Sequence, residues 1–141
     1  MLLSYCYNTG MDRRKLIKTL IYLIFLIFLV NFFANKFYWY SSIWYFDMIM
    51  HFLGGFWVGL AYFYIFLLQN MSSRLIFKIL FSVLIIGVGW EVYEILVNDI
   101  LAQNPFNYID TVSDLFFDLF GGLCAILYLW IPLEIKKFNI K

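Results

Sequence analysis

Charge is scarce in this sequence, and the scarcity excludes several classes of protein. Only 13% of the residues are charged, and the net charge is +1. A nucleic-acid-binding protein needs a basic surface to neutralise phosphates, so nucleic acid is excluded as a partner. The two cysteines, Cys6 and Cys124, form neither a metal-ligand spacing nor a redox spacing. Internal repeats and low-complexity linkers are also lacking, which favours a single domain over residues 1–141.

Apolar and aromatic residues are abundant instead. Hydrophobic residues make up 65% of the chain and aromatic residues 23%, which is the composition of a membrane protein. Four apolar runs are each long enough to cross a bilayer as a helix, at a rise of about 1.5 Å per residue. We therefore predict an all-α polytopic membrane protein with four transmembrane helices, at about residues 16–33, 46–68, 75–97 and 111–131.

Polar and aromatic segments separate these runs. A basic lead around Arg13 precedes the first run, but no small-residue cleavage site follows it, so we predict a retained span rather than a signal peptide. The aromatic connector at 35–45 is typical of a belt or short helix at the membrane interface. A polar turn at 69–74 and a longer loop at 98–108 separate the later runs. Met1 and Met11 both remain open as the start of translation.

The basic residues predict the orientation of the chain in the membrane. A topology of four spans places nine of the ten Lys and Arg residues on one side, and only Lys36 on the other. Cytoplasmic segments of membrane proteins carry an excess of Lys and Arg. Both termini are therefore expected in the cytoplasm.

Acidic residues interrupt the apolar runs in three places, in the motifs Asp47-x-x-x-His51, Glu91-x-x-Glu94 and Asp110-x-x-x-Asp114-x-x-x-Asp118. An ionisable side chain at membrane depth is costly, and no Lys or Arg lies within these segments to pair with it. The start of the second span, the end of the third and the start of the fourth share the outer side of this topology. We therefore expect the six carboxylates and the only histidine to meet at one depth.

Glycines continue each acidic stripe toward the membrane interior. Residues three or four apart share a helix face, and on these three helices that face adds Gly55, Gly59, Gly87 and Gly122. The pattern Gly55-x-x-x-Gly59 lets transmembrane helices approach closely. We predict that the four glycines pack the helices together beneath an outward-facing polar cup. The first span has neither acid nor glycine at such spacing and is expected to pack outside the cup.

Some of these residues have simple structural interpretations. Asp47 and Asp110 can cap the second and fourth helices, so we place them at the rim of the cup. A lone histidine is more often a hydrogen-bonded contact between helices than a ligand, but among carboxylates at one level His51 becomes a candidate. The remaining acids lie inside the spans, where no cap needs them.

Carboxylates crowded in a low dielectric must either take up protons or bind a cation, and the sequence leaves both open. Oxygen ligands together with one imidazole suit a divalent metal ion, with Mg²⁺, Mn²⁺, Ca²⁺, Fe²⁺ and Zn²⁺ as candidates. The predicted metal ligands are His51, Glu91, Glu94, Asp114 and Asp118.

These motifs resemble those of the VanZ-like membrane proteins. The shared motifs are Asp47-x-x-x-His51-Phe52 and Asp114-x-x-x-Asp118-x-x-Gly121. The VanZ-like pattern has Gln at Glu94, Asn at Asp118 and an Arg before the last motif that this chain lacks. Two acidic pairs are more similar to the related YjdF-like proteins, namely Glu91-x-x-Glu94 and Asp110-x-x-x-Asp114. The resemblance covers about residues 47–122 and implies a small protein of the bacterial inner membrane, in a family linked to the cell envelope and to glycopeptide (teicoplanin) resistance.

Three functions from different classes fit the sequence. A metal-dependent enzyme would act on an envelope lipid or a lipid-linked phosphate, using the ion to activate water or to polarise a phosphoryl group. An ion- or proton-coupled transporter or channel would use the carboxylates as a relay, and with so few helices it would need to form a homo-oligomer. A structural membrane subunit is the third, and the excess of unpaired acid argues against it. Membrane lipids are expected partners in every case.

Overall fold

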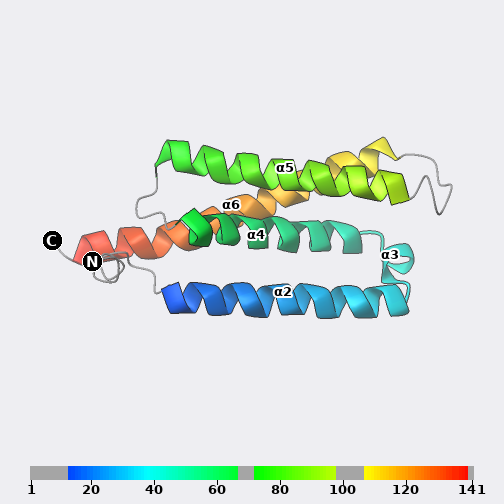
Figure 1. Cartoon of the computed structure of the whole chain (residues 1–141), viewed down its shortest axis with the longest axis horizontal. Helices are drawn as coiled ribbons and strands as arrows, with labels where there is room; N and C mark the ends of the chain where they lie inside the picture. The colour runs from blue at the N-terminus through cyan, green and yellow to red at the C-terminus, as the bar shows by residue number, and fades with distance from the viewer. Residues whose placement is uncertain (1–12, 67–71, 98–106, 140–141) are drawn as a thin grey trace.

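The computed structural model describes residues 13–66, 72–97 and 107–139, and the regular structure within these ranges is helical (Figure 1). The helices are α2 (Arg13–Lys36), α3 (Trp39–Ser42), α4 (Phe46–Phe66), α5 (Ser73–Val97) and α6 (Tyr108–Asn139). Both candidate start residues, the first half of the predicted turn at 69–74, most of the loop at 98–108, and Lys141 lie outside the described residues.

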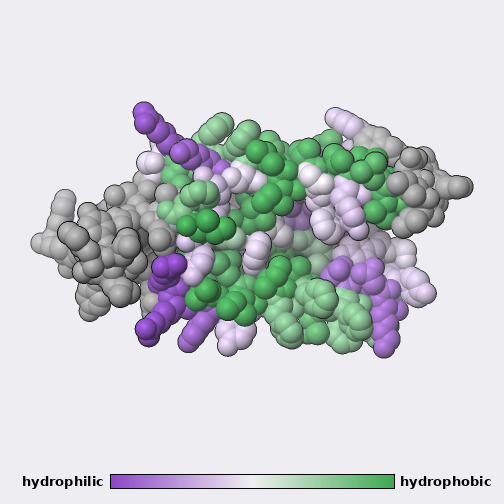
Figure 2. All heavy atoms as spheres, in the orientation of Figure 1, coloured by the Kyte–Doolittle hydropathy of each residue, from purple (hydrophilic) through white to green (hydrophobic). Residues whose placement is uncertain are grey.

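Within the described part of the chain, four helices are long and apolar enough to cross a membrane, which confirms the predicted fold class. These spans are Arg13–Lys36, Phe46–Phe66, Ser73–Val97 and Tyr108–Ile131. Large apolar side chains cover their outer faces, and Phe25, Phe77 and Phe116 are each more than 60% exposed. Figure 2 shows this apolar surface across the middle of the molecule, with hydrophilic residues gathered toward its ends. Such a surface is solvated by lipid rather than by water.

α4 is the central helix of the bundle. It packs against α2, α5 and α6, and its packing against α6 is the most extensive. In Figure 1, α2 and α5 flank α4 on opposite sides while α6 crosses behind it. The core contains fully buried apolar side chains from α4, α5 and α6, namely Leu60, Ile79, Val83, Ala125 and Leu129.

The antiparallel order of the spans gives the bundle two chemically different ends. The start of α4, the end of α5 and the start of α6 lie together beside α3, at what we call the α3 end (Figure 1). The starts of α2 and α5 lie at the opposite, basic end, which carries Arg13, Arg14, Lys15, Lys18, Arg74 and Lys78. The acidic motifs are all at or near the α3 end.

Two glycines bring the neighbouring helices against Asp118 of α6. A Cβ added at Gly55 of α4 would collide with the backbone carbonyl of Asp118. A Cβ added at Gly87 of α5 would collide with the Asp118 carboxylate. Gly55 therefore lets the α6 backbone at Asp118 lie directly against α4, and Gly87 leaves room for the Asp118 carboxylate beside α5.

Further glycines extend this close packing toward the basic end. Gly121 lies directly against the α4 backbone, a contact that the helical phase argument did not identify. An added Cβ at Gly59 would lie 2.8 Å from the Ala125 side chain, and one at Gly122 would lie 3.0 Å from the Val83 side chain. These distances are shorter than normal carbon–carbon contacts of about 3.5–4.0 Å, so the helices approach as closely as their backbones allow.

α6 continues past its predicted end. The fourth helix was expected to end near Ile131, with a short tail after Pro132, whereas it continues to Asn139. A proline removes one backbone donor from a helix, but its fixed φ is compatible with helical geometry. The residues that follow, at positions 133–137, include the good helix formers Leu, Glu and Lys, which favour continuation.

The aromatic connector between α2 and α4 contains the short helix α3. Tyr38 precedes this short helix with a φ of 57°, in the left-handed region that residues other than glycine rarely adopt. Its carbonyl accepts hydrogen bonds from the backbone N–H of Ser42 at 3.0 Å and from the Ser41 hydroxyl at 3.0 Å. The turn lets the Tyr40 hydroxyl donate to Asn31 Oδ1 of α2 at 2.7 Å, which ties α3 to the first span.

Candidate metal centre at a buried histidine

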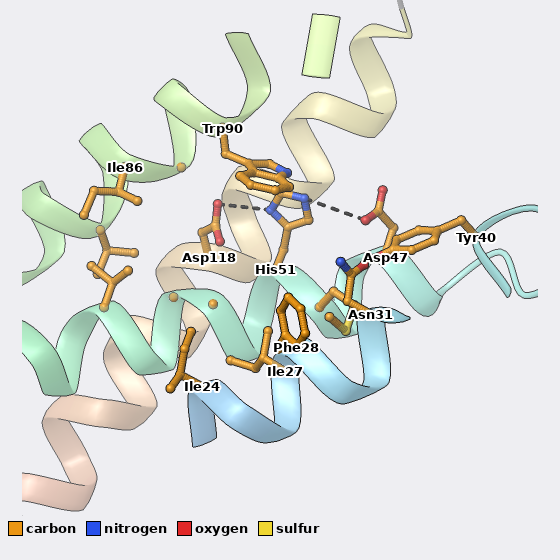
Figure 3. A pocket seen from close by; sticks show the side chains of 16 residues that line it. Ile24, Ile27, Phe28, Asn31, Tyr40, Asp47, His51, Ile86, Trp90 and Asp118 are labelled. Atoms are coloured by element: carbon orange, nitrogen blue, oxygen red, sulfur yellow. Dashed lines mark hydrogen bonds and ion pairs between the residues drawn. The ribbon is translucent and has the colours of Figure 1, made fainter. Parts of the chain in front are cut away.

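His51 is the centre of the candidate site. Its side chain is buried on α4, about 8 Å along the axis from the start of that helix. Its Nδ1 atom lies 3.2 Å from Asp118 Oδ2. Its Nε2 atom lies 3.8 Å from Asp47 Oδ1 and 3.7 Å from Glu91 Oε1. Figure 3 shows the ring between the carboxylates of Asp118 and Asp47.

The contact with Asp118 favours one tautomer of the ring. Where the Asp118 carboxylate is ionised it can only accept a hydrogen bond, so a neutral ring that makes this contact carries its proton on Nδ1. In a neutral imidazole, Nε2 then keeps its lone pair. That lone pair lies on the side of the ring occupied by Asp47 and Glu91. A histidine oriented in this way by a carboxylate is the usual arrangement at protein metal sites.

Two buried carboxylate oxygens near the histidine make no hydrogen bond in the described part of the chain. Glu91 is 5% exposed and Asp114 is 2% exposed. Glu91 Oε1 and Asp114 Oδ1 accept no hydrogen bond from any described residue. A buried polar atom left in this state costs about 1–3 kcal/mol, and more when it is charged. Within the described ranges, Asp47, Glu91 and Asp118 each form an ion pair with His51, and none of them forms one with Lys or Arg.

The ligand atoms fall into two overlapping groups that share His51. One contains Asp47, His51 and Asp114, and the other contains His51, Glu91 and Glu94. Within each group the ligand atoms lie within 4.8 Å of one another. Two oxygens on opposite sides of a Ca²⁺ ion are separated by about 4.6–5.2 Å, twice the usual Ca²⁺–oxygen distance, so the spacing suits a shared ion.

The predicted ligands therefore take different places. His51, Glu91, Glu94 and Asp114 belong to these groups, whereas Asp118 belongs to neither and lies on the Nδ1 side of the ring. Asp47 was expected at the rim, and its partly buried side chain belongs to the first group. Asp110 is exposed and outside both groups. It was expected as a cap, but α6 begins at Tyr108, so Asp110 lies inside the first turn of the helix.

A cavity of about 290 Å³ adjoins the histidine. Its polar end is formed by Asp47, His51 and Asp118, together with Asn31 and Tyr40. The rest of its wall is apolar and comes from α2, α4 and α5 (Figure 3). α2 is therefore a wall of the site, and not only the outer support that its composition suggested.

Two polar residues of this wall were missed by the sequence argument. Asn31 interrupts the apolar run of the first span, and that isolated amide was the available signal. Tyr40 was assigned only to the interfacial belt. Partial burial, and then the negative charges of Asp47 and Glu94, raise the pKa of Tyr40 to about 12. The phenol therefore stays protonated and can donate its hydrogen bond to Asn31 at any physiological pH.

Comparison with known proteins gives one result. A sequence model of a family described as predicted membrane proteins, DUF2238, matches residues 3–134. The matched segment includes the four spans and the residues of the candidate site. No curated protein and no solved structure matches the chain.

Proposed function

This chain belongs to the DUF2238 family of predicted membrane proteins, and from that premise we propose a metal-dependent function in the cell envelope. His51 and the surrounding carboxylates bind one divalent cation. The centre acts on the polar end of a membrane lipid or lipid-linked phosphate. The VanZ-like and YjdF-like motifs described above support a place in the bacterial inner membrane. The gathering of Lys and Arg at the opposite end supports an outward-facing α3 end.

Two buried carboxylate oxygens that make no hydrogen bond to a described residue carry this proposal. Glu91 Oε1 and Asp114 Oδ1 are buried without a hydrogen bond, on different helices and close to the same imidazole. Ionised carboxylates in such a place repel one another, and a bound cation removes both the repulsion and the missing contacts. A structural role in helix packing would not require polar atoms to be left unsatisfied.

The donor set fits a hard or borderline divalent ion. Carboxylate oxygens with one imidazole are suitable ligands for Mn²⁺, Mg²⁺, Ca²⁺, Fe²⁺ or Zn²⁺. Asp118 holds the ring so that Nε2 faces the acids, and Asp47 links the centre to the cavity. When bound, such an ion supplies Lewis acidity, which polarises a phosphoryl or carbonyl oxygen and lowers the pKa of a bound water.

The test is the thermal stability of the purified protein in detergent, with and without each divalent cation. Binding to the folded state stabilises it by mass action, so at least one cation is expected to raise the melting temperature in a concentration-dependent way. Glu91→Gln or Asp114→Asn removes a ligand charge and should abolish the increase. Asp110→Asn is the matched control, because Asp110 is exposed and outside both ligand groups, and it should retain the full increase.

Two results would contradict the metal proposal. An equal increase in wild type, Glu91→Gln and Asp114→Asn would show that the ion binds elsewhere. A stability that responds to pH and not to any cation would favour the second class of function, a proton- or ion-coupled transporter in which the carboxylates around His51 pass protons. A transporter of four spans would also be expected to assemble from several copies. The mass of the purified complex, corrected for bound detergent, would report the number of copies.

A further inference from the structure

The cavity beside His51 opens sideways, toward the lipid. Its floor is buried and includes His51, Val83 and Asp118. Its rim is exposed on both sides, with Phe28 of α2 at 69% and Trp90 of α5 at 55% exposure. α2 and α5 each pack against α4 and not extensively against each other, and they lie on opposite sides of the pocket (Figure 3).

The two ends of the cavity lie at different depths along the spans. Ile24, at its apolar end, lies near the middle of α2, about 17 Å from either end of that helix. Val58 and Val83 line the same region at mid-helix positions of α4 and α5. The polar end at Asp47 lies near the start of α4. A lipid in the surrounding membrane has the same order, with its chain at the centre and its headgroup toward one surface.

Gly54 keeps this space open. A Cβ added at Gly54 would meet no atom within 4 Å, although the next residue, Gly55, is packed against the α6 backbone. Close helix packing therefore explains Gly55 and not Gly54. Gly54 lines the cavity, where any larger side chain would occupy the space itself.

We propose that this groove, lined by Ile24, Phe28, Gly54, Val58, Ile86 and Trp90, binds one hydrocarbon chain of an amphiphile whose oxyanion headgroup lies beside Asp47 and His51. The volume of about 290 Å³ is at the lower end of the range for small-molecule sites, roughly 300–1,000 Å³, so it suits one chain rather than two. This inference rests on the proposed function, because the acidic end would repel a phosphate or carboxylate unless the cation lies between them.

The test uses three photoreactive probes that share one diazirine-bearing alkyl chain and differ in the headgroup, which is a phosphate, a carboxylate or an amine. Each is added to the full chain in phosphatidylcholine vesicles with Mn²⁺ or with EDTA. Cross-linked residues are then mapped by mass spectrometry. With Mn²⁺ an oxyanion probe should label Ile24, Phe28 and Ile86 several-fold more than Phe116, which is exposed on α6 away from the groove. The stronger of the two oxyanion probes identifies the headgroup.

A matched pair of variants separates the groove from the metal centre. Gly54→Leu fills the groove and should abolish the enrichment at Ile24 while keeping the Mn²⁺-dependent rise in melting temperature. Gly89→Leu is the control, since a Cβ at Gly89 also meets nothing within 4 Å and Gly89 does not line the cavity. It should keep both the enrichment and the temperature rise.

The outcomes distinguish the two proposals. Equal labelling of Ile24 and Phe116, or unchanged labelling in Gly54→Leu, would overturn the chain groove even if Mn²⁺ still stabilises the protein. Labelling that is strongest with the amine probe, or that EDTA does not reduce, would overturn the oxyanion headgroup. Groove labelling in a protein that no cation stabilises would overturn the metal function and, with it, the cation-bridged headgroup.

Discussion

At the level of single residues, chemically identical carboxylates have different tasks at this site because they face different atoms of His51. Asp118 lies on the Nδ1 side, where its carboxylate accepts a hydrogen bond from the ring. Asp47 and Glu91 lie on the Nε2 side, where the lone pair is. Removing the acid on the Nδ1 side should weaken the orientation of the imidazole ring. Removing an acid on the Nε2 side should remove a metal ligand.

Asp118→Asn tests this division of tasks. The amide oxygen of Asn can still accept the Nδ1–H bond, but without charge it orients and activates the imidazole less strongly. We expect the affinity for the stabilising cation to fall by about 10- to 100-fold, as is usual for the hydrogen-bond partner of a metal-binding histidine. Isothermal titration of the purified protein measures this, with Asp110→Asn as the control that should match wild type. Unchanged affinity would show that Asp118 does not orient the ring, and a loss as complete as in Glu91→Gln would make it a direct ligand.

The sequence could predict which residues gather at the site but not this division. Helical spacing puts Asp47 and His51 on one face of α4, and the four-span topology puts the other acids at the same end. Neither the spacing nor the topology indicates which nitrogen of the His51 ring each acid approaches. That depends on the separation of α4 and α6, which the contact between Gly55 and the Asp118 backbone sets.

At the level of helices, two adjacent glycines of α4 have opposite tasks. Gly55 lies against the α6 backbone, and Gly54 lines the open groove. The sequence predicts packing for Gly55 from its spacing to Gly59. It gave no reason to assign Gly54 to a cavity, because a groove depends on what α2 and α5 leave uncovered and not on the residues of α4 alone.

Alanine substitutions at these neighbours should therefore differ sharply. Gly55→Ala forces α4 and α6 apart, and overpacking of this kind destabilises a protein by about 1–3 kcal/mol. Gly54→Ala adds a methyl group to open space and raises helix propensity, so the free energy of unfolding should stay equal or rise by up to about 1 kcal/mol. Unfolding in mixed micelles at increasing denaturant measures both values. Equal stability of the two variants would mean that α4 and α6 are not held in close contact at Gly55.

At the level of the whole molecule, the four spans were predictable because each is a continuous apolar run that can satisfy its backbone only as a helix in lipid. Which helices touch was less predictable. Lipid tails are as apolar as Leu and Phe, so apolar faces do not specify partners in a membrane. Small residues do, and the glycines of α4 and α6 lie where these two helices touch. The position of α2, which has no glycine, came only from the structure.

The distribution of basic residues predicts how the whole bundle is oriented in the membrane. The basic residues at the starts of α2 and α5 share one end of the molecule, and the candidate site lies toward the other (Figure 1). Retention of Lys and Arg in the cytoplasm should therefore place the site toward the outer leaflet. Alkaline phosphatase, which is active only outside the cytoplasm, should be inactive when fused after Lys141 and active when fused after Asn107, immediately before α6. The reverse pattern would place the carboxylates toward the cytoplasm, and any lipid headgroup beside His51 would then come from the inner leaflet.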